Sequence, residues 1–267
     1  MSTTRSALIA LCVFSLFTTA LVAKGKKKKE GPVRHESRWA KKLDADPEVK
    51  ELEKDEAKKL LAALSKAVKT KDANKIIAAA EPMITKSHET FFKDLAKLAK
   101  HRSGNVRIVA TKALGSQKEP AKKIGSTLTG LLMYKPNKSY GPALGMIIDS
   151  LRRQKFTRKP TVDEIEGIFK KQTHPKAMRA AARYFGDNLM LDRVKLLVQW
   201  VEAPQPASVN SPSNPPASYW KRMWEIWNEM KETVWYSLET MTGKDFKTKR
   251  EWEQWCRSPE AKRMGVD

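Results

Sequence analysis

The 267-residue chain has little cysteine and little histidine, and this scarcity excludes several kinds of site. Cys12 and Cys256 are its two cysteines, too few for a cysteine-ligated zinc site, and its four histidines are scattered singly. It contains no G-x-S-x-G elbow, Walker A loop, dinucleotide-binding glycine pattern or H-E-x-x-H helix. We therefore expect no catalytic residue set, no metal site and no cofactor, and no small-molecule substrate is evident.

Acidic residues and strand-like patterns are also sparse. Lys and Arg number 52 against 30 Asp and Glu, which gives a formal charge of +22. Such an excess attracts polyanions or acidic proteins, although solvated helix faces account for it equally well. No segment alternates apolar and polar residues with β-branched enrichment, so no sheet is expected. Hydrophobic content of 40% and eight Trp predict a folded chain.

The N-terminus has the three-part pattern of a secretory signal peptide. A short polar start with one positive charge precedes an apolar run over 7–23 that ends in small residues. We predict a signal peptide over 1–23, cleaved after residue 20 or 23, and an exported protein of the periplasm or cell envelope. The run stands at the lower length limit for crossing a bilayer, so a retained anchor is the alternative. After cleavage one cysteine remains, Cys256, which we expect to be a buried free thiol.

Residues 24–45 are predicted to form a disordered basic leader. Four consecutive lysines lie in it: Lys26, Lys27, Lys28 and Lys29. These lysines are candidates for contact with an anionic partner or membrane surface, and a merely solubilising tail is the alternative. Membrane contact is expected only through this leader or a retained signal segment.

A helical period recurs over residues 46–202, which we predict to be an all-α domain. Apolar residues spaced i, i+3, i+4 and i+7 begin at four positions, separated by 33, 38 and 33 residues: Ala73, Val106, Leu144 and Ala177. Each of these helices is followed by a second apolar helix. Such a period predicts a short α-solenoid of stacked helix pairs, and a further helix over 47–70 is expected to cover its N-terminal end.

Helix-boundary signals accompany this period. Thr161 with Glu164 has the spacing of a capping box, and Pro175 suits the first turn of a helix. Gly115 and Gly186 stand where helices are expected to stop.

Two of the repeated segments resemble a known family. SGNVRIVATKALG at 103–115 resembles the first helix of a HEAT repeat, roughly V-R-x-x-A-x-x-A-L-G, and PKAMRAAARYFG at 175–186 is similar. The copies at 74–84 and 140–151 are degenerate, because the first lacks the glycine and the second lacks the arginine. The resemblance covers residues 73–202. It implies a curved stack with an extended binding surface, and it implies no reaction.

The HEAT resemblance also implies roles for single residues. In that family the arginine usually supports packing between repeats. Arg107 and Arg179 are therefore expected to be repeat-packing residues, together with Gly115 and Gly186.

Residues 203–217 are rich in Pro, Ser and Asn and predict a linker, and residues 218–267 a Trp-rich helical tail. One helical face is predicted from the spacing of Trp220, Trp224, Trp227, Val234, Trp235 and Leu238. We expect this stripe to pack on the solenoid, and a partner-docking surface at the first three tryptophans is the alternative. Interfacial membrane binding is less favoured, because the polar face mixes acids with bases.

The end of the tail resembles that of exported bacterial HEAT-type proteins, roughly T-G-x-x-F-x-T-D and then W-x-x-W. Thr242-Gly243, Phe246 and Thr248 match it, and Trp252 and Trp255 form the tryptophan pair. A lysine follows Thr248 where that tail has an acid, and the spacing to the pair is shorter. The resemblance supports export and assigns no activity.

These patterns together predict a non-catalytic binding or scaffold protein of the cell envelope or periplasm. A basic helical-repeat surface would recognise a protein or an anionic envelope polymer. The alternative is an intracellular HEAT-like solenoid that binds nucleic acid, a partner that export makes irrelevant. Basic HEAT-like solenoids of this kind include a family of bacterial DNA glycosylases, which need a carboxylate and aromatic side chains in a cleft. The candidates here are Asp149, Asp187 or Asp192 with Trp200.

Overall fold

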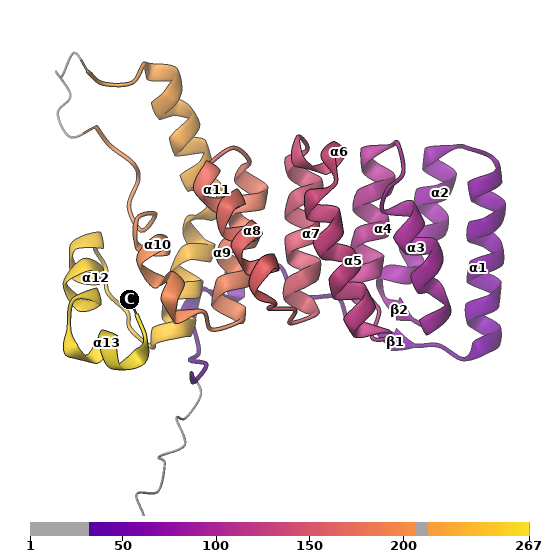
Figure 1. The fold of residues 1–267 in the computed structure, drawn as a ribbon, viewed down its shortest axis with the longest axis horizontal. Helices are drawn as coiled ribbons and strands as arrows, with labels where there is room; N and C mark the ends of the chain where they lie inside the picture. Colours follow the sequence, from indigo (N-terminus) through magenta and orange to yellow (C-terminus); the bar gives the residue numbers. More distant parts are fainter. Residues whose placement is uncertain (1–31, 207–212, 267) are drawn as a thin grey trace, which may run out of the picture. The chain divides into compact units, whose positions relative to one another are not determined.

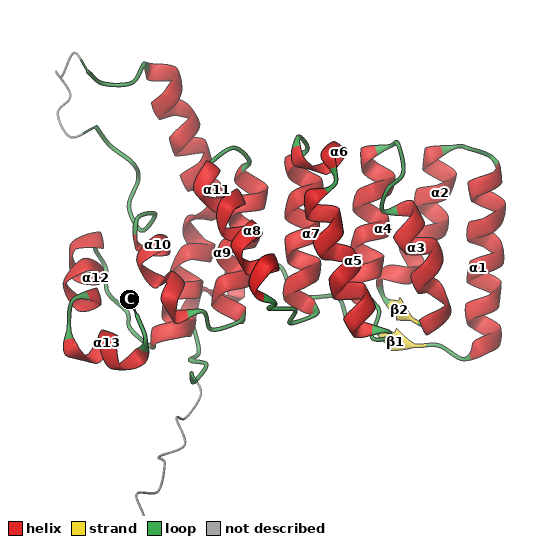
Figure 2. Cartoon of the chain, viewed as in Figure 1, coloured by secondary structure: helices red, strands yellow, loops and turns green. Residues whose placement is uncertain are grey.

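The computed structural model describes residues 32–206 and 213–266. Over these residues the fold is almost entirely helical, which confirms the predicted all-α class (Figure 2). The predicted signal peptide, the lysines Lys26 to Lys29 and residues 207–212 of the predicted linker lie outside the described residues.

Five helices pack one against the next in chain order, and we call them the inner row (Figure 1). They are α2 (Ala73–Ala80), α4 (Gly104–Ser116), α7 (Gly141–Arg153), α9 (Pro175–Asp187) and α11 (Ala217–Thr242). The first four contain the four predicted repeat starts. Helix α9 begins at Pro175, as predicted, and α4 and α9 each end one residue after the expected glycine.

Four outer helices pack on this row, and further helices lie next to its ends. The outer helices are α3 (Phe92–Leu98), α5 (Ala121–Met133), α8 (Lys159–Lys171) and α10 (Val194–Val198). At the N-terminal end α1 (Lys54–Lys69) packs on α2, beginning later than the 47–70 span predicted. The remaining helices are α6 (Lys135–Lys138), α12 (Lys249–Cys256) and α13 (Pro259–Met264), with short 3-10 turns at Arg38–Lys42, Glu81–Ile84, Glu89–Phe91 and Leu191–Arg193.

The apolar positions of the helical period form one continuous core. Each inner helix contributes fully buried side chains, among them Ile76, Leu114, Ile147, Phe185 and Leu238. Burying apolar side chains of this size stabilises the fold by about 1.5–3 kcal/mol each, so packing between helices dominates over intrinsic helix propensity. Cys256 is a buried free cysteine, as predicted, and burial raises the pKa of its thiol.

Two local predictions are wrong. Two-residue strands, β1 (Lys50–Glu51) and β2 (Lys86–Ser87), pair in parallel although no sheet was expected, because two residues are too few to show alternation. The capping box expected at Thr161 is absent, since α8 already begins at Lys159, and the Thr161 hydroxyl lies 2.8 Å from that of Thr129.

Candidate functional site

Residues 34–51, which we call the strap, run from α11 to β2 across the inner row. At one end the backbone N–H of His35 donates to the Thr240 carbonyl of α11, 3.0 Å away. The Ser37 hydroxyl donates to the buried Glu239 carboxylate at 2.8 Å. At the other end the strap becomes β1. The strap therefore covers part of the face that the inner row would otherwise present.

The strap differs from the disorder predicted for residues 24–45. Trp39 stacks on Trp235 of α11 with ring centroids 6.3 Å apart, and Arg38 donates to Asp245 at 2.9 Å. Composition predicts disorder because the segment has few apolar residues. Its partners are distant in sequence and mostly polar, so composition alone does not reveal them.

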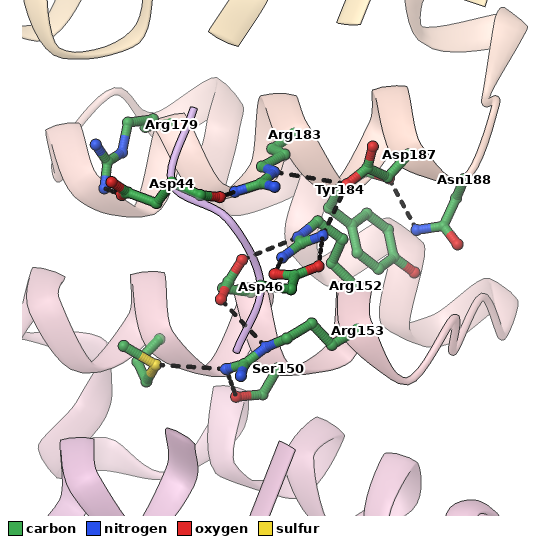
Figure 3. A network of polar contacts seen from close by, with 12 residues as sticks. Asp44, Asp46, Ser150, Arg152, Arg153, Arg179, Arg183, Tyr184, Asp187 and Asn188 are labelled. Atoms are coloured by element: carbon green, nitrogen blue, oxygen red, sulfur yellow. Dashed lines mark hydrogen bonds and ion pairs between the residues drawn. The ribbon is translucent and has the colours of Figure 1, made fainter. Parts of the chain in front are cut away.

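One buried arginine joins the strap to two inner helices (Figure 3). The side chain of Arg152 in α7 is 5% exposed. Its Nη1 donates to Asp46 of the strap at 2.9 Å and to Asp187 of α9 at 2.8 Å. Its Nε donates to Asp149, one turn earlier in α7, at 2.9 Å. A single guanidinium thus contacts carboxylates from three elements.

Asp187 extends this network to α11. Its carboxylate accepts hydrogen bonds from the Tyr236 hydroxyl of α11 at 2.5 Å and from Arg34 of the strap at 2.8 Å. Arg183, one turn before Asp187 in α9, donates to the Asp44 carbonyl of the strap at 2.8 Å. The strap is therefore held through its backbone as well as through its side chains.

The charges of the network stabilise one another. Burial raises the pKa of Asp46, but the hydrogen bond and charge of Arg152 outweigh it, so the net pKa lies below its ordinary 3.8. Burial also raises the pKa of Asp187, and the Tyr236 hydroxyl and Arg152 lower it further than burial raises it. The pKa of Arg152 is raised in spite of burial by the three carboxylates. All of these groups are ionised at neutral pH, which suits a structural clamp.

No motif or spacing in the sequence points to Arg152 or Arg153 as functional residues. The available signal was a pair of arginines at the end of an otherwise apolar helix, with Asp149 one turn before them. Such a pair on an inner helix indicates a buried acidic partner somewhere in the chain.

A cavity of about 670 Å³ lies between the strap and the inner row. Strap residues 42–47 form one wall, and side chains of α4, α7, α9 and α11 form the others. This volume is within the range of small-molecule pockets.

The connections that precede the first four inner helices carry exposed cations in pairs. The pairs, which we call the basic edge, are Lys69 and Lys71, Lys100 and Arg102, Lys135 and Lys138, and Lys170 and Lys171. Figure 1 shows these connections at one end of the inner helices. Two contacts join the last three of them. The Tyr134 hydroxyl donates to the Lys100 carbonyl at 3.4 Å, and His174 Nε2 lies 3.3 Å from the Lys138 carbonyl.

Acidic groups scarcely offset the basic edge. Asp72 is the one acid in those connections, and its carboxylate is occupied in capping α2, where it accepts from the Asn74 N–H at 2.9 Å. Lys138 pairs with Glu164 at 3.7 Å, and Lys170 pairs with a glutamate one turn earlier. The other six cations have no ion-pair partner among the described residues. Six of the eight cations of the edge are therefore uncompensated among the described residues.

The two arginines expected at repeat contacts lie in different environments. Arg107 is buried in α4, and its Nε donates to Asn137 of α6 at 2.7 Å. Its Nη1 donates to the His101 carbonyl at 3.0 Å and its Nη2 to the Pro136 carbonyl at 3.1 Å. It thus links the start of α4 to the next helix pair.

Arg179 is exposed by 46% and borders the cavity. It pairs with Glu229 of α11 at 3.4 Å and lies 3.8 Å from Asp44 of the strap. Counting back eight residues from the glycine of each copy places Met178 where α4 has Arg107. The arginine of the second copy is therefore one position out of register, on another face of its helix.

Gly115 and Gly186 both lie where two inner helices approach closely. A Cβ at Gly115 would lie 2.4 Å from the Cβ of Ser150, and one at Gly186 would lie 2.6 Å from the Cβ of Ser237. In each case the serine hydroxyl donates to the carbonyl four residues before the glycine. These two hydrogen bonds are Ser150 Oγ to Thr111 O, 3.1 Å, and Ser237 Oγ to Ala182 O, 2.8 Å.

The predicted stripe of α11 packs on the core only in part. Trp224 is 48% exposed, with its Nε1 donating to the Pro204 carbonyl at 2.8 Å, and Trp220 and Trp227 are half-buried. Two members of the predicted stripe, Val234 and Leu238, are buried as expected, together with Met223, Ile226, Met230 and Met241. The three tryptophans and the buried methionines both have helical spacing and lie on adjacent faces of α11. The helical period of the sequence alone therefore does not show which of the two faces is buried.

The residues considered for a glycosylase-like cleft already have structural partners. Asp149 and Asp187 belong to the ion-pair network of Figure 3, and Asp192 pairs with its neighbouring arginine at 2.7 Å. Trp200 is buried with its ring against Phe169.

Comparison with known proteins adds no relative. No protein-family model, no curated protein and no solved structure matches the chain. In the part of the chain that the structure describes, no three His, Cys, Asp or Glu side chains are grouped to hold a metal ion. Nor does any helix among those residues have the length and apolarity to cross a membrane.

Proposed function

We propose that the protein is an exported, HEAT-like α-solenoid that binds an acidic partner without catalysing a reaction. The partner is a protein with an acidic surface or an anionic polymer of the cell envelope, and it binds along the basic edge. The proposal is supported by one observation above all. Four successive connections at the same end of the inner row each present two exposed cations, with a single acid among them.

Helix stability alone does not explain this arrangement. Lysines in the last turn of a helix interact favourably with its dipole, which accounts for Lys69, Lys170 and Lys171. Lys71, Lys100 and Arg102 lie beyond the helix ends, where this benefit has largely gone. Packed helices stand roughly 10 Å apart, so the cation pairs of the basic edge repeat at about that spacing. A row of positive charge of this kind suits a linear polyanion or an extended acidic surface.

Charge reversal along the basic edge tests the proposal. We expect the quadruple variant Lys100→Glu, Arg102→Glu, Lys135→Glu, Lys171→Glu to bind a soluble polyanion such as heparin at least roughly tenfold more weakly at low salt. Wild-type affinity should fall steeply with added NaCl, and that of the variant should fall less. Fluorescence anisotropy with a labelled polyanion at several salt concentrations measures both quantities.

A matched variant separates the edge from net charge. Lys54, Lys123, Arg257 and Lys262 are exposed, have no ion-pair partner among the described residues and lie away from the edge. Reversing these four changes the formal charge by the same amount. Equal weakening in both variants, or a salt-independent affinity, would show that the edge is not the binding surface.

Export is tested separately, by fractionation and intact mass of the native protein. We expect a chain that lacks its first 20 or 23 residues, located outside the cytoplasm. A full-length chain in the soluble cytoplasm would overturn the export proposal. The basic edge would then be tested against nucleic acid, the alternative partner.

A further inference from the structure

The cavity beneath the strap has an uneven charge balance. Its five carboxylates each have a cation nearby, with ion pairs from Asp44 to Arg179, Asp46 to Arg152, Asp149 to Arg152, Glu229 to Arg179 and Glu232 to Lys42. Lys112 of α4 and Lys176 of α9 also line the cavity, and neither has an ion-pair partner among the described residues. The groups left without compensation are therefore cationic.

Arg153 is the most unusual of the cavity's cations. Its side chain is 8% exposed, and its one carboxylate contact is from Nε to Asp149 at 3.4 Å. Arg152 already binds that carboxylate at 2.9 Å. The Arg153 Nε has no hydrogen-bond acceptor in the described part of the chain. Its Nη atoms contact neutral acceptors, Ser116 Oγ at 3.2 Å, Ser150 Oγ at 3.4 Å and Met146 Sδ at 3.9 Å.

A buried guanidinium in such surroundings is poorly stabilised. Burial lowers the pKa of Arg153, and the shared Asp149 compensates only in part. Arg152, one residue earlier, is also buried, but its full set of carboxylates raises its pKa. Buried cations ordinarily have a dedicated anionic partner, because desolvation of an unpaired charge is costly.

We propose that the cavity binds a small oxyanion, a carboxylate- or phosphate-bearing molecule, between Lys112 of α4 and Arg153 of α7. Arg153 Nε is enclosed beside Asp149, but the two Nη groups hold only neutral acceptors. They form a planar pair of donors that suits two oxygens of one anion, and Lys112 supplies a second positive charge. Lys176 lines the same cavity from α9 and favours a ligand with a further anionic group. None of the residues that line this cavity belongs to the basic edge, so the two sites are distinct.

Calorimetric titration of the full chain with inorganic phosphate and with citrate tests the site. NaCl at matched ionic strength is the control for general screening. We expect saturable binding of at least one of the two, and the better probe identifies phosphate or carboxylate as the preferred chemistry. Absence of saturable binding by both would overturn the proposal.

Two substitutions locate the binding. Lys112→Ala removes a half-buried lysine that has no ion-pair partner among the described residues, and Arg153→Lys keeps the charge but removes the planar pair of donors. Each is expected to weaken binding roughly tenfold or more, because a charged hydrogen bond is lost. Lys123→Ala, exposed on α5, is the matched control and should bind as the wild type does. Wild-type affinity in Lys112→Ala would overturn the proposal, even if Arg153→Lys fails to fold.

Discussion

Replacing Arg152 by leucine is expected to lower the free energy of unfolding by about 3–5 kcal/mol at pH 7. The side chain is 5% exposed and contacts Asp46, Asp149 and Asp187 at once. Its removal leaves these carboxylates partly buried, with fewer cations to offset them. The substitution also removes one attachment of the strap, because Asp46 makes no ion pair with any other cation among the described residues.

The loss should depend on pH in a defined direction. The folded-state pKa values of Asp46 and Asp187 lie below the ordinary value, so each proton binds more tightly to the unfolded chain. Their contribution to stability is therefore complete above the unfolded pKa of about 3.9 and is lost as the pH falls through the lower folded value. Without Arg152 that contribution is already reduced. The difference between wild type and variant should thus be full at pH 7 and shrink below about pH 4.

Urea denaturation at pH 7 and near pH 3 measures both effects. Arg102→Leu is the matched control, because it removes an exposed arginine without an ion-pair partner among the described residues. It is expected to change stability by less than about 0.5 kcal/mol. A loss for Arg152→Leu that is equally large at both pH values would mean that packing, and not the carboxylates, accounts for the role of this arginine.

The helices could be predicted from the sequence because their signals are local. Apolar residues at i, i+3 and i+4 lie on one face whatever the rest of the chain does, and Pro175 suits only the first turn of its helix. The strap could not be predicted in this way. Arg152 and Asp46 are 106 residues apart. Nothing in the composition around Asp46 indicates that its carboxylate pairs with a buried guanidinium.

The face of α11 shows a second limit of sequence patterns. Tryptophan is larger than methionine, so a hydrophobicity pattern favours Trp220, Trp224 and Trp227 as the buried stripe. Packing instead depends on which side chains fit the surface of α9. Near its end α11 approaches α9 so closely that Ser237 meets Gly186. Flexible methionines such as the fully buried Met230 fill irregular gaps between closely packed helices better than rigid indoles.

That approach makes Gly186→Ala the second substitution with a large expected effect. A Cβ at Gly186 would lie 2.4 Å from the Ser237 hydroxyl oxygen and 2.7 Å from the Ser237 backbone, so the backbones of α9 and α11 must separate. We expect the free energy of unfolding to fall by about 3 kcal/mol, in spite of the better helix propensity of alanine.

Gly167→Ala in α8 is the control, because a Cβ there meets nothing within 4 Å. It should raise stability by about 0.5–1 kcal/mol, so the same chemical change acts in opposite directions at the two sites. Adding Ser237→Gly to Gly186→Ala should recover part of the loss, since the serine side chain is removed while the backbone of residue 237 still crowds the new methyl group. Guanidinium denaturation of the four chains measures these differences. If Gly186→Ala stabilises the protein as Gly167→Ala does, the two helices do not pack through this glycine, and the close approach is not what fixes α11 on α9.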